Sequence, residues 1–340
     1  SGTTQPITRT NVQIQRQSSY GAANIDAVQI ENVTMFVQRA KRKVRELVYN
    51  LNIDQYQAQD MTLLAEHITD GGITEMAYQQ EPDSVLWCVR SDGTLIGFTY
   101  ARAEEVVGWH RHILGGAFSS GNAVVESVAS IPTDANEDEL YVIVKRTING
   151  ATRRYVEYLT LFDYGTDQTD AFYVDSGLTY SGSAATVITG LDHLEGQSVT
   201  ILADGSTHPN KTVSSGAITL ERSSTKVHVG LGYTSLLQTM RVEAKGEEAT
   251  SQSKTKRINE VTLRLHESVG VEVGSSLSDM ERIPFRSSAA AMSSAVPLFT
   301  GDKQVEFRDD FNTDGFVYVR QTQPLPLTVI SIYPMITVND

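Results

Sequence analysis

The stretch SVLWCVRSDGTLIGFTYARAEEVVGWHRHIL, residues 84–114, decides the fold. Two apolar runs flank the turn at residues 91–94, whose Asp-Gly pair favours the positive φ angles of a β-hairpin. A third run begins at Val106, and residues 75–78 just upstream are a candidate fourth strand. Four short antiparallel strands in about 40 residues match the size of one propeller blade.

Similar strand–turn–strand units lie on both sides of this stretch. They comprise residues 34–39 and 43–49 upstream, and residues 140–146 and 153–159 downstream, the latter pair joined through Asn149-Gly150. Arg39, Arg90 and Lys145 occupy matching places in the three units, 51 and then 55 residues apart. A period near 50 residues is typical of a blade array. Because propellers typically close with four to eight blades, we expect either further blades outside this sequence or an open arc.

Composition and charge favour a soluble globular protein. The 340 residues, 40% hydrophobic and 20% charged, are enough for two or three domains with sizeable cores. No apolar run approaches the roughly 20 residues of a membrane-spanning helix. The net charge of −13 does not favour a surface that binds nucleic acid. The chain begins Ser1-Gly2 without a methionine, so we expect the natural chain to extend upstream.

Two features with potential chemistry have simpler structural interpretations. Cys88 is the only cysteine, which excludes an internal disulfide, and it is interpreted as a small buried apolar residue rather than a nucleophile. Five basic residues in seven positions, 39–45, form either a phosphate-binding patch or a solvated hairpin tip. No aromatic residue interleaves them, and this favours the hairpin tip.

Two other clusters contain residue types that bind metals. His110 and His112 fall on one face of a strand, and Glu104 or Glu105 would have to supply a third ligand. The acidic segment 134–139 carries four carboxylates but lacks the spacing and the distal glutamate of a calcium loop. Strand-lining histidines and a solvated loop are the favoured interpretations. No nucleophile elbow or nucleotide loop occurs either, so we expect no catalytic, cofactor-binding or metal-binding residues and no cofactor.

The remaining chain is predicted to be β-rich, with one helix. Residues 52–69 are the best helix candidate, because Asp60 can cap it and apolar residues between 61 and 68 share one face. Glycines and serines in residues 162–183 mark a boundary. Five short strands follow, which is typical of a small barrel. Residues 236–244 and 257–265 are long alternating strands, residues 275–294 an irregular connector, and three further strands complete the chain.

The predicted fold class is therefore all-β, with propeller-type antiparallel blades, a small inserted β-barrel and a C-terminal β region. The predicted domains are a polar N-terminal segment (1–20), propeller-like blades (21–175), the inserted barrel (176–235) and the C-terminal region (236–340), which completes the blade domain.

Seven blocks of sequence occur in a fixed order: SYGAANID (19–26), FVQR (36–39), VREL (44–47), DMTLLAEHI (60–68), GLDHLEG (190–196), QTQPLPLT (321–328) and Tyr333-Pro334. In this order they resemble the C-terminal part of phage and prophage tail nozzle proteins. These proteins are relatives of podovirus tail tubular protein B and are also called stabilisation proteins. The inserted barrel resembles the module known as an FCCH-like domain.

The resemblance implies a structural role without catalysis. It implies a ring of subunits, six-fold in this family, at the distal end of a virion tail, together with other tail proteins. The genome would pass through the ring without specific binding. The protein would be made in the cytoplasm of the bacterial host. An acidic balance suits such a conduit, because each basic contact with the phosphate backbone would retain DNA.

Two other classes of function stay open from the sequence. The first is a glycan-binding or glycan-cleaving propeller acting on host surface polysaccharide, with Trp87, Tyr100 and Trp109 as sugar-stacking aromatics. The same aromatics are more commonly blade core. The second is an adaptor that binds a peptide or a host factor through blade edges or loops.

Overall fold

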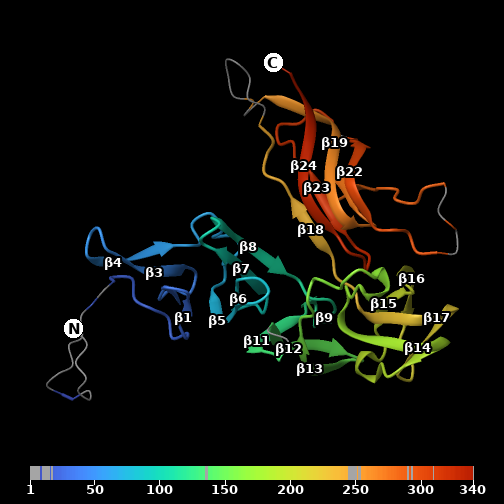
Figure 1. Ribbon diagram of the computed structural model, residues 1–340, viewed down its shortest axis with the longest axis horizontal. Coiled ribbons are helices and arrows are strands. Elements are labelled where there is room, and N and C mark those ends of the chain that lie inside the picture. The colour runs from blue at the N-terminus through green and yellow to red at the C-terminus, as the bar shows by residue number, and fades with distance from the viewer. Residues whose placement is uncertain are drawn as a thin grey trace. The chain divides into compact units, whose positions relative to one another are not determined.

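The computed structural model describes residues 8–9, 16, 18–134, 137–243, 251, 254–288, 291, 294–308 and 310–339. In these residues antiparallel β-strands build the chain, and two three-residue 3-10 turns, η1 (Gln168–Asp170) and η2 (Asp192–Leu194), are the only helical elements. The predicted all-β fold is confirmed (Figure 1). Most of the N-terminal segment 1–20 lies outside the described residues.

The chain divides into two compact units. Residues 1–112, 124–145 and 154–159 form the first unit, and residues 113–123, 146–153 and 160–340 form the second. The division into four domains that was drawn from the sequence stays a prediction.

The first unit contains two antiparallel sheets and most of a third, whose hairpin end (residues 146–153) belongs to the second unit. Each sheet has its strands in sequence order. The first sheet contains β1 (Val28–Ile30), β2 (Val33–Val37), β3 (Val44–Asn50) and β4 (Gln55–Asp60). The second contains β5 (Ile73–Gln79), β6 (Val85–Arg90), β7 (Leu95–Ala101) and β8 (Val106–His112). The third contains β11 (Val124–Pro132), β12 (Asp138–Ile148) and β13 (Ala151–Tyr158). These meanders are the propeller-type blades expected from the repeat, and the candidate strand at 75–78 lies in β5.

The second blade is buried on both faces, which explains its nearly continuous apolar strands. Leu86, Cys88 and Phe98 pack in one core with Met35 and Val44 of the first blade. On the other side, β11 contacts β5 and β6. Five of the six residues of β6 are buried as a result. The stretch that decides the fold is therefore the middle layer of the blade array.

The turn between β6 and β7 requires its glycine for two reasons. Gly93 has a φ of 83°, in the left-handed region that side chains rarely adopt. A Cβ at this position would also lie 2.4 Å from Cγ1 of Val124, at the start of the third blade. Only the glycine of this Asp-Gly pair has the positive φ expected from the sequence, because Asp92 keeps a negative φ. The Asp92 side chain accepts a hydrogen bond from the Thr94 N–H at 3.0 Å. The turn thus brings the backbones of two blades close together.

The helix predicted over residues 52–69 is wrong. Residues 55–60 form β4, the edge strand of the first blade, and residues 61–72 form turns that connect it to β5. Apolar residues do recur there at helical spacing, but Leu64 is 94% exposed while Ala65 and Ile68 are buried. Tertiary packing of these two residues against the blade core replaces the helix.

The second unit contains a small β-barrel module made from one curled antiparallel sheet. Its strands are β14 (Asp175–Thr189), β17 (Ala217–Leu231), β15 (Ser198–Ala203) and β16 (Ser206–Thr212), in that order across the sheet. The two 15-residue strands pair along their length with register shifts, and apolar residues such as Leu191, Val199 and Val229 fill the interior. The module begins inside the segment that the sequence marked as a boundary, because β14 continues through its glycines.

The C-terminal part of the second unit is a sandwich of two sheets around one core. One sheet has the order β18 (Ser235–Gln238), β23 (Tyr318–Gln321), β20 (Glu272–Ser276), β21 (Asp279–Arg282), and the other has the order β22 (Phe299–Glu306), β19 (Thr255–Ser268), β24 (Thr328–Asn339). Val261, Leu263 and Val319 lie in the shared core. The connector predicted at 275–294 is partly wrong, because a hairpin of β20 and β21 occupies its beginning. A short ribbon of β9 (Ala117–Phe118) and β10 (Gly121–Asn122) also belongs to this unit.

A third, smaller core joins the barrel module to the sandwich. Ala171 and Leu202 from the barrel side pack with Val269 and Leu325 from the sandwich side. All four side chains are buried. The two parts of the second unit are therefore in fixed contact at this point.

Candidate assembly surfaces

The basic segment 39–45 forms the hairpin tip between β2 and β3, and acidic groups of its own unit neutralise much of it. Arg42 forms an ion pair with Asp70. The Nζ of Lys43 lies 2.8 Å from Asp60 and 3.0 Å from Glu66, and these hydrogen bonds raise the pKa of Lys43. These pairings agree with the hairpin-tip interpretation better than with a phosphate-binding patch.

Arg45, the last of the five basic residues, points back into its own blade. Its guanidinium donates to Oε1 of Gln38 at 2.7 Å and to the Ala58 carbonyl at 2.8 Å. The same group lies 3.4 Å from the ring centroid of Tyr20, in the geometry of a cation–π contact. Three of the five basic side chains thus have partners within the first unit.

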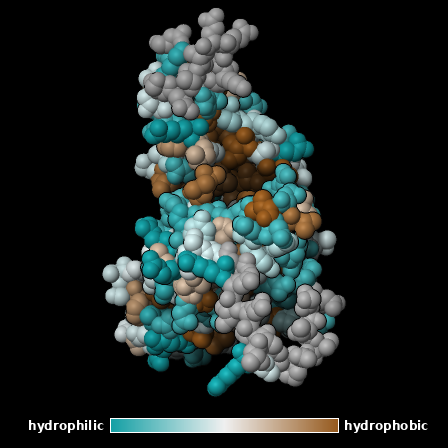
Figure 2. Space-filling model, turned by 90° about the vertical axis from the view of Figure 1, so that its left-hand side faces the viewer, coloured by the Kyte–Doolittle hydropathy of each residue, from teal (hydrophilic) through white to brown (hydrophobic). Residues whose placement is uncertain are grey.

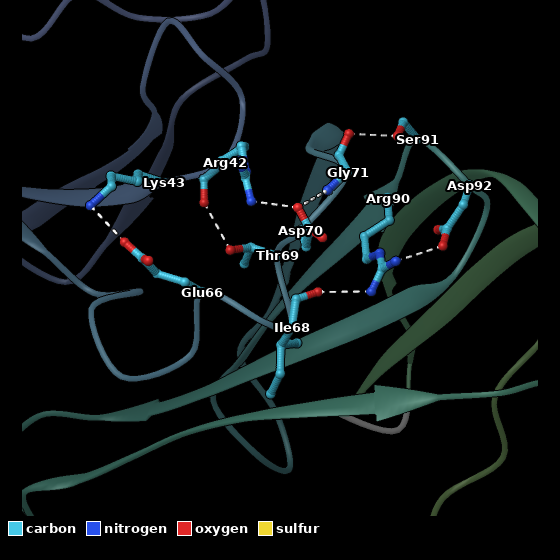
Figure 3. Close-up of polar contacts among 10 residues, drawn as sticks. All are labelled: Arg42, Lys43, Glu66, Ile68, Thr69, Asp70, Gly71, Arg90, Ser91 and Asp92. Carbon is cyan, nitrogen blue, oxygen red and sulfur yellow. Dashed lines mark hydrogen bonds and ion pairs between the residues drawn. The ribbon is translucent and has the colours of Figure 1, made fainter.

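Residues 66–71 connect this hairpin tip to the turn of the second blade, as Figure 3 shows. On the first-blade side, the Thr69 hydroxyl donates to the Arg42 carbonyl at 2.8 Å. On the second-blade side, Arg90 donates to the Ile68 carbonyl at 3.0 Å and Ser91 donates to the Gly71 carbonyl at 2.6 Å. These contacts hold neighbouring blades at a fixed spacing.

The repeated basic positions of the second and third blades are likewise paired within their own sheets. Arg90 lies 2.6 Å from Asp92, and Lys145 lies 2.8 Å from Glu126. Glu126 also contacts Arg154 at 2.6 Å, and hydrogen bonds from Arg154 and Lys145 lower the pKa of Glu126 to about 2. The 50-residue spacing of these cations therefore marks a structural feature of the blades.

His110 and His112 lie on one face of β8, as the sequence predicts, and they contact each other. Nδ1 of His110 is 2.7 Å from Nε2 of His112, and the Thr99 hydroxyl is 3.1 Å from the other ring nitrogen of His110. Among the described residues, no group of three or more His, Cys, Asp or Glu side chains is arranged to hold a metal ion. Glu104 and Glu105 lie in an exposed turn. The histidines therefore belong to a packed polar cluster beside Trp87.

The three aromatics considered for sugar stacking belong to the second blade. Trp87 and Tyr100 are buried. Trp109 is half-buried, stacks on Phe98 at a centroid distance of 4.6 Å and donates its indole N–H to the Met61 carbonyl. The interpretation of these rings as blade core is confirmed.

The acidic segment 134–139 includes Ala135 and Asn136, which lie outside the described residues. Of its carboxylates, Asp138 accepts from the backbone N–H groups of Gln80 and Glu81, at 2.7 and 3.3 Å. Glu139 instead accepts from the Tyr141 hydroxyl at 2.8 Å. These two side chains are thus engaged with separate partners. The loop interpretation is wrong for both residues, because pairing with β11 makes them the first two residues of β12.

Large apolar side chains are exposed on edge strands of both units. In the third blade, Val156 of β13 is 71% exposed and Tyr158 is 54% exposed. On β18, the consecutive Leu236 and Leu237 are 49% and 42% exposed, and Met240 just beyond is 88% exposed. A further row lies on the outer side of β24 and contains Ile330, Tyr333 and Met335.

Figure 2 shows where such residues gather on one face. Hydrophobic residues concentrate in a hollowed area in the upper half of the view, whereas most of the surface below is hydrophilic. Monomeric proteins rarely expose large contiguous apolar patches, so this region is a candidate contact surface.

Comparisons with known proteins leave the function open. No protein-family model matches the chain, and no curated protein matches it. Two solved structures of an exo-beta-1,3-galactanase from Phanerochaete chrysosporium with beta-1,3-galactotriose are weakly similar. They share 11% and 12% identity with the chain over 93% and 89% of its length and over 69% and 65% of theirs, with TM-scores of 0.27 and 0.24. In the described part of the chain, no helix has the length and apolar character needed to cross a bilayer.

Proposed function

We propose that this chain is a structural component of a phage or prophage virion tail. In this role, copies associate into a ring at the end of the tail and form a conduit for genome ejection, in contact with other tail proteins. The identity of the assembly rests on the ordered blocks of sequence that resemble tail nozzle proteins. The observation that supports association between copies of the chain is the exposed apolar edge at β18.

This edge has two properties of an interface between subunits. β18 is the outer strand of its sheet and pairs with β23 on one side only among the described strands. An outer strand offers backbone groups to a further strand, and isolated edges of this kind are usually protected by charges. Here the edge carries Leu236, Leu237 and, just beyond, Met240. Burying them against a neighbouring subunit would contribute roughly 25 cal/mol per Å² of apolar area.

The net charge of −13 supports the same role. A conduit works only if DNA can leave it. Basic side chains in contact with phosphates would hold the DNA back, because such contacts release the counterions of the DNA and thereby strengthen binding. The hairpin tip 39–45 is the densest basic segment noted in the sequence, and Asp60, Glu66 and Asp70 pair with two of its cations.

The decisive experiment measures the mass of the chain in solution and images the particles by electron microscopy. We expect closed rings with a hole wide enough for duplex DNA, and we expect Leu236→Lys with Leu237→Lys to reduce assembly without unfolding the chain. Leu277→Lys is the matched control, because Leu277 is 51% exposed between β20 and β21 at the opposite edge of the same sheet. A stable monomer would contradict the proposal and favour a binding module.

A further inference from the structure

The second unit contains a cavity of about 490 Å³ between the barrel module and the sandwich. Its walls come from residues that are distant in sequence. They include Gln168 of η1, Ser206 and Thr207 at the start of β16, Arg222 of β17, residues 269–270 and 282–286, and Gln323 with Leu325. The small core of Ala171, Leu202, Val269 and Leu325 lies next to it and fixes both walls. Cavities that hold small molecules usually have volumes of about 300–1,000 Å³.

The charge of the lining is strongly one-sided. Arg222, Arg282 and Arg286 line the cavity, and no aspartate or glutamate is among its described lining residues. This contrasts with the chain as a whole, which has 41 acidic and 28 basic residues. A cleft with charges of one sign and low-dielectric walls concentrates the field and attracts ligands of the opposite sign.

Each of the three arginines is positioned by the surrounding structure. Arg222 donates to the Ala203 carbonyl at 3.2 Å, and Arg286 donates to the Ser294 carbonyl at 2.8 Å. Arg282 lies 3.1 Å from Glu272, but Arg320 shares the same carboxylate at 2.8 Å, so one negative charge serves two arginines. A guanidinium has five N–H donors, and these contacts use only part of them. Planar donors held in this way suit carboxylate recognition.

The remaining lining combines neutral polar groups with an apolar floor. Gln168, Gln323, Ser206 and Thr207 supply amide and hydroxyl groups, and Gln168 is held by a 2.9 Å hydrogen bond to the Gly205 carbonyl. Val269, Leu325 and the half-buried ring of Phe285 supply apolar surface. A ligand that fits needs a negative group, several hydroxyls and one apolar face. Inorganic phosphate has the charge but would leave the apolar surface and most of the volume unused.

We propose that this cavity binds an acidic saccharide, a sugar that carries a carboxylate. The carboxylate lies against the arginines Arg222 and Arg282, the sugar hydroxyls face Gln168, Gln323 and Thr207, and the carbon–hydrogen face of the ring packs on Phe285. The site does not depend on the proposed tail role, since it lies within one unit of a single chain.

Calorimetric titration of the full chain tests the proposal with four probes. They are a uronic-acid disaccharide, N-acetylneuraminic acid, a neutral disaccharide and inorganic phosphate. We expect one of the acidic sugars to bind, the neutral disaccharide to bind at least tenfold more weakly, and affinity to fall as salt is added. We expect Arg222→Gln and Arg282→Gln each to weaken binding of the acidic sugar about tenfold or more, as is typical when one charged hydrogen-bonding partner is removed.

Arg264→Gln is the control for general loss of positive charge, because Arg264 lies on β19 outside the cavity and is ion-paired with Asp302. Arg222→Lys, which keeps the charge but not the planar donor pair, should bind with intermediate affinity. Thermal unfolding identifies any variant that fails to fold. If Arg282→Gln fails to fold, the Arg222 variants alone test the proposal, because the described partner of Arg222 is a backbone carbonyl. Failure of both acidic sugars to bind, equal binding of the neutral sugar, phosphate binding as tight as the sugar, or equal effects of the Arg264 and Arg222 variants would each overturn the proposal. None of these results bears on ring assembly, so the two proposals fail separately.

Discussion

His110 and His112 share a close contact between ring nitrogens, with Nδ1 of the first 2.7 Å from Nε2 of the second. At this distance one proton lies between the two nitrogens, and two protonated rings would repel each other. The pair is enclosed by Trp87, whose ring centroid is 5.7 Å from that of His110 and 4.9 Å from that of His112. The folded second blade therefore favours neutral histidines.

From this histidine pair we predict that the free energy of unfolding decreases in mildly acidic solution. Burial lowers the pKa of His110, and burial together with the neighbouring ring lowers the pKa of His112 to about 4. An unfolded histidine titrates near 6.5, so between about pH 6.5 and 4 the unfolded chain binds more protons. The contribution of the neutral histidine pair to the free energy of unfolding is fully present above about pH 6.5 and is lost as the pH falls towards 4. Urea unfolding at a series of pH values measures it, and His112→Asn should flatten the dependence. His67→Asn, at an exposed turn, is the control, and equal pH slopes in the two variants would contradict the prediction.

Gly97 of β7 provides the space for this cluster. It lies directly opposite both Trp87 and His110 in the sheet, and a Cβ there would lie 2.1 Å from Cε1 of His110. We expect Gly97→Ala to lower the free energy of unfolding by about 1–3 kcal/mol, the usual cost of overpacking. Gly108→Ala on β8 is the matched control, because no atom lies within 4 Å of its added methyl group. Its effect should stay within about 0.5 kcal/mol, and chemical denaturation compares the two.

The contacts of Figure 3 predict unequal roles for two arginines. The Arg90 side chain is 16% exposed and donates to the Ile68 carbonyl, whereas Arg42 is 59% exposed in its ion pair with Asp70. Removing a charged donor from a mostly buried carbonyl costs about 1.5–3 kcal/mol, but an exposed ion pair contributes about 0–1 kcal/mol. Arg90→Ala should therefore destabilise the first unit more than Arg42→Ala. Equal unfolding midpoints for the two variants would argue against a role of Arg90 in holding the blades together.

Asp204 is predicted to stabilise the barrel module. Its carboxylate accepts hydrogen bonds from the Thr225 N–H at 3.0 Å, the Thr225 hydroxyl at 2.9 Å and the Lys226 N–H at 2.9 Å. Burial alone would raise the pKa of Asp204, but these hydrogen bonds outweigh it and lower the pKa below its usual value. Its contribution is present above about pH 3.9, the unfolded value, and is lost as the pH falls through the folded pKa.

Substitutions at this position separate the charge from the geometry. Asp204→Ala should cost about 1–3 kcal/mol because it leaves backbone donors without a partner. Asp204→Asn keeps one acceptor oxygen and tolerates the positive φ of 47°, so its cost should be smaller. Hydrogen exchange of the Thr225 and Lys226 amides measures the effect locally, and unchanged protection in the alanine variant would refute it.

Hairpins are the part of the fold that the sequence predicts best, because turn chemistry is local. Asn149-Gly150 is expected from the sequence to join two strands, and its φ values are 47° and 71°. Asp204-Gly205, between β15 and β16, has the same two φ values. Two consecutive positive φ angles are the requirement that Asn-Gly and Asp-Gly satisfy. The strands beside Asn149-Gly150, predicted at 140–146 and 153–159, therefore lie close to their observed bounds of 138–148 and 151–158.

The first-blade edge strand was missed because it lacks an alternating apolar pattern. β4 reads Gln-Tyr-Gln-Ala-Gln-Asp, and its residues are exposed or half-buried. The helical spacing just after it was the stronger local signal. Pairing with β3, which no local pattern reports, decided the outcome.

The arginine-lined cavity could not be predicted from sequence for a different reason. Arg222 and Arg282 are 60 positions apart, and each lies in an ordinary polar strand. Only the packing of the sandwich on the barrel module brings them to one cavity. The basic hairpin tip is more conspicuous in the sequence, and two of its five cations, Arg42 and Lys43, are paired with nearby acids.

The position of Cys88 has a practical consequence. It is the only cysteine in the chain, its side chain is fully buried in the core that the first two blades share, and burial raises the pKa of its thiol. A thiol reagent can reach it only when those blades separate, since local opening must precede any modification. The rate at which a thiol reagent modifies Cys88 therefore reports how often the first two blades open. This measurement needs no engineered probe, and it can be made while subunits assemble or a ligand binds elsewhere.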